Sequence, residues 1–279
     1  MLLAEHHYIY KWRFNMNIFL RELRANRKTL IIWSVCMFLL VVSGMGKYTA
    51  YSASGSGNEV FNNLPQSVKA LLGFGSFDVS AMAGYFAMLF LYIELTVAIH
   101  AVLLGSGIIA KEERDKTTEF LIIKPVSRGT IITSKLFAAL VNIFILNVVT
   151  FVSSIIMVAA YNKGDAISSE ISMFMLSMFI VQLIFLTLGA TLAAFIKNSK
   201  ASGSLSAGIL LATFVISKVT DLNINLNFLN LLTPFKYFSY EKIVDGNGLN
   251  VGIIILSLLL VGALSFLTYY FYKKRDLNV

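Results

Sequence analysis

The sequence predicts an all-α membrane protein with six transmembrane helices. Hydrophobic residues make up 57% of the 279 residues, charged residues only 14%, and the mean hydropathy is +0.75. Six apolar segments follow one another, each of about twenty residues or more, the length that a helix needs to cross a bilayer. We therefore expect one membrane domain over residues 1–279, with no room for a separate catalytic domain.

The distribution of charge predicts the orientation of the chain. The net charge is +8, and with both termini inside, seventeen of the 23 Lys and Arg residues fall in or beside inside segments. This asymmetry is the positive-inside bias of membrane proteins and argues against nucleic-acid binding. We expect a multi-pass protein of the cell (plasma) membrane with both termini cytoplasmic. The single cysteine, Cys36, excludes an intrachain disulfide or a cysteine metal cluster.

The N-terminal part of the chain is basic. We expect residues 1–15 to be poorly ordered. Residues 15–28 are amphipathic, which predicts a helix along the membrane interface, and three of their cations share one helical face: Arg21, Arg24 and Lys28. The first span is expected at about 29–46. A cleavable signal peptide is the alternative, but the long apolar run and extended basic flank favour a retained span.

Two polar residues lie in the second predicted span, residues 81–110. A carboxylate at bilayer depth is costly, so Glu94 should face a cavity or a polar partner. It either lines a translocation path, binding a cationic group or a proton, or pins neighbouring helices, and the sequence favours neither. His100 is expected to be a packed polar residue or part of the path rather than a metal ligand, because no metal-binding set accompanies it.

The third span, about 131–161, carries Asn142 and Asn147, and the fourth covers about 171–196. Polar side chains at this depth usually form hydrogen bonds between helices, although these two could also line a polar cavity. After a tight turn at 197–200, the fifth span runs to about residue 219. It begins with small residues at a spacing that permits close helix contact, either within the chain or in a dimer: Gly203, Ser204, Ala207 and Gly208.

Two outside segments complete the predicted topology. Residues 47–80 should contain a short interfacial helix at 63–73, which begins at Asn63-Leu64-Pro65. Residues 220–249 begin with alternating Asn and apolar residues, which could suit a short extended piece. Their aromatic residues, interleaved with Lys236 and Lys242, belong at a membrane boundary, so short outer-leaflet helices are expected there. The sixth span, about 250–272, precedes a basic inside tail.

A charged connector separates the second and third spans. Lys111 to Arg128 contain nine charges in eighteen residues. The composition favours a short helix with Glu112, Glu113 and Asp115 in its first turn, where the helix dipole favours acids. Glu112 and Lys116 have the spacing of an i,i+4 pair, and Ser127-Arg128-Gly129 can turn the chain back into the membrane.

The residue order of this connector carries a resemblance to a known family. It has three runs and one later lysine: Glu112-Glu113-Arg114, Thr117-Thr118-Glu119-Phe120-Leu121, Pro125-Val126-Ser127-Arg128, and Lys135. Together they resemble the cytoplasmic coupling loop of ABC-2-type transporter permeases, the membrane subunits of exporters driven by a separate ATPase. In that family the short helix docks in a groove of the ATPase and transmits its motion to the membrane helices. The resemblance extends over about residues 16–279.

The resemblance implies which residues couple to the ATPase: Glu112, Glu113, Arg114, Thr117, Thr118, Glu119, Phe120 and Arg128. The chain departs from the family at two of the loop positions. Lys116 takes the place of the usual Gly, and Thr118 takes the place of a Leu. We expect a stiffer helix without the Gly.

The resemblance also implies the partners. Two cytosolic ABC ATPase subunits would bind ATP and Mg, a second permease would complete a homodimer or heterodimer, and this chain would hold no cofactor. The sequence has no GxxxxGK[ST] phosphate loop, no HExxH and no GxSxG, so we do not expect an enzyme. The expected cargo is amphipathic or hydrophobic: a peptide, a lipid-linked molecule or a drug. Alternatives are an ion-extruding permease and a non-transporting membrane sensor or assembly protein.

Overall fold

The computed structural model describes residues 2–49, 65, 68–69, 78–117, 126–162, 164, 166–196 and 198–275, with side chains from residue 17 onward except that of Ile224. Its long helices are α1 (Leu2–Met45), α5 (Met82–Arg114), α7 (Arg128–Tyr161), α8 (Ser168–Phe195), α9 (Ser199–Leu222) and α11 (Val251–Lys274). All six contain an apolar stretch long enough to cross a membrane, which in α1 lies within Asn17–Met45. The predicted fold class, an all-α protein with six spans, is confirmed.

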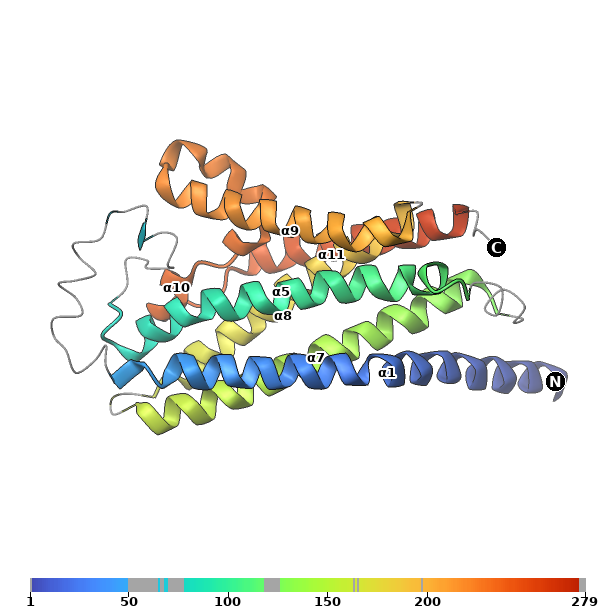
Figure 1. Ribbon diagram of the computed structural model, residues 1–279, viewed down its shortest axis with the longest axis horizontal. Coiled ribbons are helices and arrows are strands. Elements are labelled where there is room, and N and C mark those ends of the chain that lie inside the picture. The colour runs from blue at the N-terminus through green and yellow to red at the C-terminus, as the bar shows by residue number, and fades with distance from the viewer. Residues whose placement is uncertain are drawn as a thin grey trace.

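The six helices form an elongated bundle with α5 and α8 at its centre (Figure 1). In each of these two helices 67% of the apolar stretch is buried, against 33% or less in the other four. Figure 1 shows α1 and α7 on one side of the central pair and α9 and α11 on the other. The start of α1 and the end of α11 lie at one end, which we call the terminal end, and α10 lies at the opposite, distal end.

The central pair packs through two glycines. A Cβ added at Gly105 of α5 would lie 2.0 Å from the carbonyl oxygen of Leu186, and one at Gly189 of α8 would lie 2.2 Å from that of Val102. The two backbones therefore approach as closely as glycine alone allows. The small residues of α9 make looser contacts. At Gly203 the nearest atom would be 3.8 Å away, on Ser106 of α5.

Side-chain caps fix where three spans begin. Ser127 accepts a hydrogen bond from the amide of Thr130 at the start of α7, and Asn198 caps α9. Asn250 accepts from the amide of Gly252 at the start of α11. Each cap satisfies an amide that the first helical turn leaves without a partner. The expected turn before the fifth span is therefore an N-cap, and Ser127 begins a helix directly.

Short helices connect α9 and α11 at the distal end. They are η1 (Ile224–Leu232), η2 (Pro234–Lys236) and α10 (Tyr240–Val244). Short helices before the sixth span were predicted and are confirmed, whereas the extended piece suggested by the Asn-rich alternation is wrong, because those residues form the 3-10 helix η1. Asn223 initiates η1 by accepting a hydrogen bond from the amide of Asn225. The helix expected over 63–73 lies largely outside the described residues.

Residues 15–28 and the first span belong to the single continuous helix α1. The boundary expected near residue 28 is therefore absent from α1. The placement of residues 15–28 along the membrane interface and the poor order of residues 1–15 stay predictions. The helix α1 packs mainly on α7 and contacts α5 much less.

Candidate coupling site

Helix α5 ends inside the charged connector. Asp115 caps it, and Lys116 adopts the left-handed conformation, with φ of 54°. The amide of Thr117 donates to the carbonyl of Glu112 at 2.8 Å, and that of Lys116 to Glu113 at 3.3 Å, which together form a Schellman C-cap. The prediction that the acids lie in the first turn of a separate short helix is wrong, because Glu112 and Glu113 lie in the last turn of α5. Lys116, at the position where the family usually has Gly, lies just beyond the end of α5. The expected stiffer helix through this position is therefore absent.

A carboxylate in the last turn of a helix faces the negative end of the helix dipole, so Glu112 needs cations. It is buried and accepts hydrogen bonds from the ammonium of Lys135 on α7 and, at 2.9 Å, from the guanidinium of Arg21 on α1. Lys135 is fully buried and also donates to the carbonyl of Ile108. The expected pair between Glu112 and Lys116 is wrong, because Lys116 lies beyond the helix.

A second buried acid, Glu22 of α1, joins this cluster. One of its oxygens accepts from Arg21 at 2.8 Å, and the other lies 3.9 Å from the ammonium of Lys111. Glu22 was not predicted from the sequence, because it is a single acid within a basic segment. Its position four residues after the buried Ile18 places it on the inward face of α1, and that spacing was the available signal.

The end of α11 is tied to both sides of the connector. Arg275, one residue beyond α11, donates to the carboxylate of Glu113 and to the carbonyl of Ala193 on α8. From the first turn of α7, Arg128 donates to the carbonyl oxygens of Lys273 and Arg275, at 3.1 and 2.7 Å. A cation at a helix C-terminus satisfies free carbonyls and complements the dipole. Glu113 and Arg128 therefore hold the terminal end of the bundle together.

The remaining predicted coupling residues divide into two groups. Arg114 and Thr117 are exposed at the end of α5. The guanidinium of Arg114 lies 3.3 Å from the carboxylate of the adjacent Asp115. Thr118, Glu119 and Phe120 lie outside the described residues. The connector thus leaves α5 through an exposed stub, directly above a buried ionic cluster that joins α1, α5 and α7.

Comparison with known families decides the class of this bundle. The family model of the ABC-2 family transporter proteins matches residues 16–277. The chain belongs to the ABC-2 transporter family. It is a membrane permease subunit of an ABC transporter and not the ATPase of that transporter. A search of the curated proteins finds no match to the chain.

The ABC-2 permease has another buried carboxylate away from this cluster, Glu94, in the distal half of α5. Its side chain is 1% exposed and accepts a hydrogen bond from the hydroxyl of Tyr240 on α10. Burial raises the pKa of Tyr240 well above its ordinary value, and the neighbouring carboxylate raises it further, so the phenol stays protonated and donates a hydrogen bond. Phe90 and Phe174 pack edge-on against the same ring. Glu94 thus joins α5 to the distal short helices.

A further ionic group lies beside Glu94 and was missed from the sequence. Asp221, at the end of α9, pairs with Lys218 at 3.4 Å and with Lys236 of η2. Lys218 also lies close enough to Glu94 to interact electrostatically. These contacts connect α9, η2 and the distal half of α5. They also surround Glu94 with polar partners, which an ionisable side chain inside a membrane needs because its burial without a partner is costly.

The four residues predicted for a translocation path do not form one cluster. Asn142 donates to the carbonyl of Ala138 in its own helix, at 2.8 Å. Asn147 donates to α8, at the carbonyl of Met175 and the amide oxygen of Gln182, at 3.1 and 3.4 Å. His100 faces α1, where its ring lies 5.1 Å from that of Trp33. The contacts of both asparagines are packing contacts, and the role of all four in transport stays a prediction.

Proposed function

We propose that this ABC-2 permease belongs to an ATP-driven exporter that moves an amphipathic or hydrophobic cargo out of the cytoplasm. Two cytosolic ATPase subunits, which bind ATP and Mg, would drive a pair of permeases, identical or related, in the plasma membrane. The ionic cluster at the end of α5 is the observation that carries this proposal. It lies where the connector predicted to contact the ATPase leaves the bundle.

The exposed stub, residues 114–117 at the end of α5, is where the ATPase would transmit its motion to the permease. Arg114 and Thr117 are exposed and continue directly into Thr118, Glu119 and Phe120, the residues that the family resemblance implies for docking. The terminal end bears the basic residues of α1, the connector and the end of α11, so the positive-inside rule favours a cytoplasmic position for it. An ATPase bound there would press on the last turn of α5.

The ionic cluster explains how such a push would spread. A buried ion pair resists separation, because each group would be left as an unpaired charge away from water. Glu112 connects α5 to α7 through Lys135 and to α1 through Arg21, and Glu113 connects α5 to Arg275 after α11. A displacement of the stub would therefore move four helices together, and the cavity between two permeases would change its access.

Purification from the native host tests the partnership. We expect an ATPase subunit to accompany the tagged chain in mild detergent, and recovery of the permease without one would count heavily against the proposal. The Arg114→Glu variant should lose the ATPase and retain its unfolding temperature. The matched control is Arg24→Glu, a charge reversal at an exposed position of α1 near the same end, which should retain the ATPase.

Reconstitution tests the transport step. Proteoliposomes of the whole complex should consume ATP faster when an exported amphiphile, such as a cationic dye or an apolar peptide, is present, and should move that compound. Glu113→Gln removes the charge that holds Arg275 but leaves the stub intact. We expect it to keep ATPase binding and to lower the cargo moved per ATP. ATP hydrolysis that ignores every amphiphile, together with ion flux, would support the ion-extruding alternative instead.

A further inference from the structure

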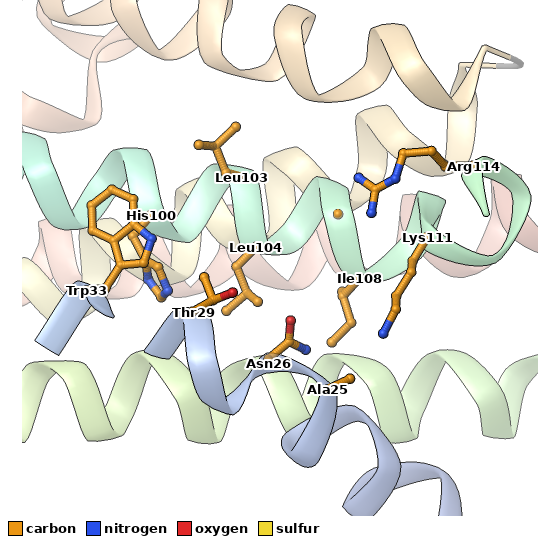
Figure 2. Close-up of a pocket in the computed structure, with 11 residues that line it drawn as sticks. Ala25, Asn26, Thr29, Trp33, His100, Leu103, Leu104, Ile108, Lys111 and Arg114 are labelled. Carbon is orange, nitrogen blue, oxygen red and sulfur yellow. The ribbon is translucent and has the colours of Figure 1, made fainter. Parts of the chain in front are cut away.

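A groove lies between α1 and α5, and residues of both helices line it (Figure 2). Its volume is about 390 Å³. Trp33 and His100 lie at one end of the groove in Figure 2, and Lys111 and Arg114 lie toward the other. The groove is separate from the contacts of Glu94, and it runs toward the terminal end of α5.

The terminal end of the groove is cationic. The ammonium of Lys111 faces the carboxylate of Glu22 only at 3.9 Å, beyond the length of a strong hydrogen bond. The side chain of Arg114 is half exposed, and the amide group of Asn26 lies across the groove from α1. Two cations beside an amide on facing helices form a site suited to a phosphate or carboxylate.

The deep end of the groove is different. His100 is 3% exposed and its Nδ1 atom has no hydrogen-bond partner among the described residues. A buried polar atom left unpaired costs free energy, which a ligand that pairs with it would recover. His100 and Lys111 are eleven positions apart on one helix, or roughly 16 Å at the rise of an α-helix. Leu104 and Ile108, both apolar, line the wall between them.

We propose that the α1–α5 groove binds an amphiphile with an anionic headgroup, a phosphate or carboxylate, and an apolar chain. Lys111 and Arg114 bind the headgroup, the chain lies along Leu104 and Ile108, and a hydroxyl or carbonyl on the chain pairs with His100. Along the groove, two cations are followed by an apolar wall and then by a polar atom. A small ion would leave the apolar wall without a contact, and a purely apolar molecule would leave the cations without a partner. Binding requires only that the helices span a bilayer, whichever cargo the transporter moves.

The tryptophans provide a direct probe. The chain has two, and Trp12→Phe leaves Trp33, at the deep end of the groove, as the reporter. A variant that also carries Trp33→Phe supplies the background from any accompanying subunit. The full chain is placed in nanodiscs of neutral phosphatidylcholine, and phosphatidylglycerol with brominated acyl chains, which quench tryptophan, is titrated in. We expect saturable quenching by the anionic lipid and much weaker quenching by brominated phosphatidylcholine.

Matched variants assign the headgroup site. Lys111→Gln with Arg114→Gln should weaken the anionic lipid roughly 30-fold, since each cation near a membrane surface contributes about fivefold. Arg24→Gln with Arg27→Gln removes two exposed cations of α1 that do not line the groove, and it should leave binding unchanged. Equal quenching by both brominated lipids, or equal loss in both double variants, would overturn the proposal.

Two competitors identify the source of the anion and the role of His100. Inorganic phosphate should not displace the brominated lipid, and displacement would mean that the groove is an ion site and not an amphiphile site. A hydroxylated fatty acid should compete about fivefold better than the same acid without the hydroxyl, the gain expected from one hydrogen bond. His100→Phe should abolish that difference. An unchanged difference in this variant would remove His100 from the site.

Discussion

Lys135 of α7 has no exposed side-chain surface, and its ammonium donates a hydrogen bond to the carboxylate of Glu112 in the last turn of α5. The lysine stands 23 positions after the glutamate, on the far side of the connector. The two helices that flank the connector are therefore joined directly beneath it. Glu112 is the charged partner of Lys135, and Glu112 has Arg21 as a second cation.

Removal of either charge should destabilise the ABC-2 permease strongly. Glu112→Gln leaves Lys135 buried without its carboxylate, and Lys135→Met leaves Glu112 with Arg21 alone. Each should lower the free energy of unfolding by about 3–5 kcal/mol, because the remaining charge cannot reach water. Thermal unfolding in detergent measures the effect.

The double variant Glu112→Leu with Lys135→Met tests the coupling of the pair. It should be more stable than either single variant, because neither member of the pair is then left buried without the other. Asp115→Asn, at an exposed acid three residues away, is the control and should change stability little. Single variants as stable as this control would show that the pair contributes nothing.

Lys116 carries backbone strain that a substitution can release. Lys116→Gly should raise the free energy of unfolding by about 1 kcal/mol, because a side chain disfavours the left-handed conformation that ends α5. Lys116→Gln removes the same charge but retains a side chain, so its stability should stay near that of the parent. An equal gain in both variants would assign the effect to charge, and no gain in either would exclude strain.

The contact between α5 and α8 should tolerate no added methyl group. Gly189→Ala would drive a Cβ against the carbonyl of Val102, and we expect a loss of at least about 3 kcal/mol or failure to fold. Gly208→Ala in α9 is the matched control, since nothing lies within 4 Å of its added Cβ. It should be neutral or stabilising. Gel-filtration profiles of the fluorescently tagged variants report the folded fraction.

Glu94 is expected to act in packing and not in the translocation path. Glu94→Gln retains an acceptor for Tyr240, so transport and resistance to cationic substrates should remain near the parent values. Tyr240→Phe removes the donor from a buried carboxyl and should cost about 1–3 kcal/mol of stability. Tyr237→Phe, whose hydroxyl bonds an exposed carbonyl, is the control. Loss of transport in a stable Glu94→Gln variant would instead place this residue on the path.

Hydropathy and the positive-inside rule predicted the six spans, because a helix in lipid must satisfy its own backbone and present apolar side chains. The same rules could not show that α5 continues through Arg114. The helix-dipole rule assigned Glu112 and Glu113 to a helix start, since it considers one helix alone. In the folded chain, Lys135 and Arg275 supply the cations that make these acids stable at a helix end.

The ionic cluster at the end of α5 was predicted only in part, because rules that consider one helix alone do not show contacts between helices. Glu112, Glu113 and Arg128 were selected as contacts for another protein, and the structure places them in contacts within this chain. Glu22 was missed because burial of one acid depends on which neighbour its helix face meets. The glycine contact of α5 and α8 was also missed. Ala101 and Gly105, and likewise Gly189 and Ala193, have the small-residue spacing that permits close contact, but the sequence does not show which two helices cross there.

The bond between Glu113 and Arg275 sets an order for biogenesis. A ribosome that has made Glu113 must add 162 further residues before its cation exists. The terminal end of α5 therefore remains without this partner, through the insertion of four more spans, until the codons that follow α11 are translated. A nascent chain released before those codons would contain all six spans and still lack the connection that closes the bundle.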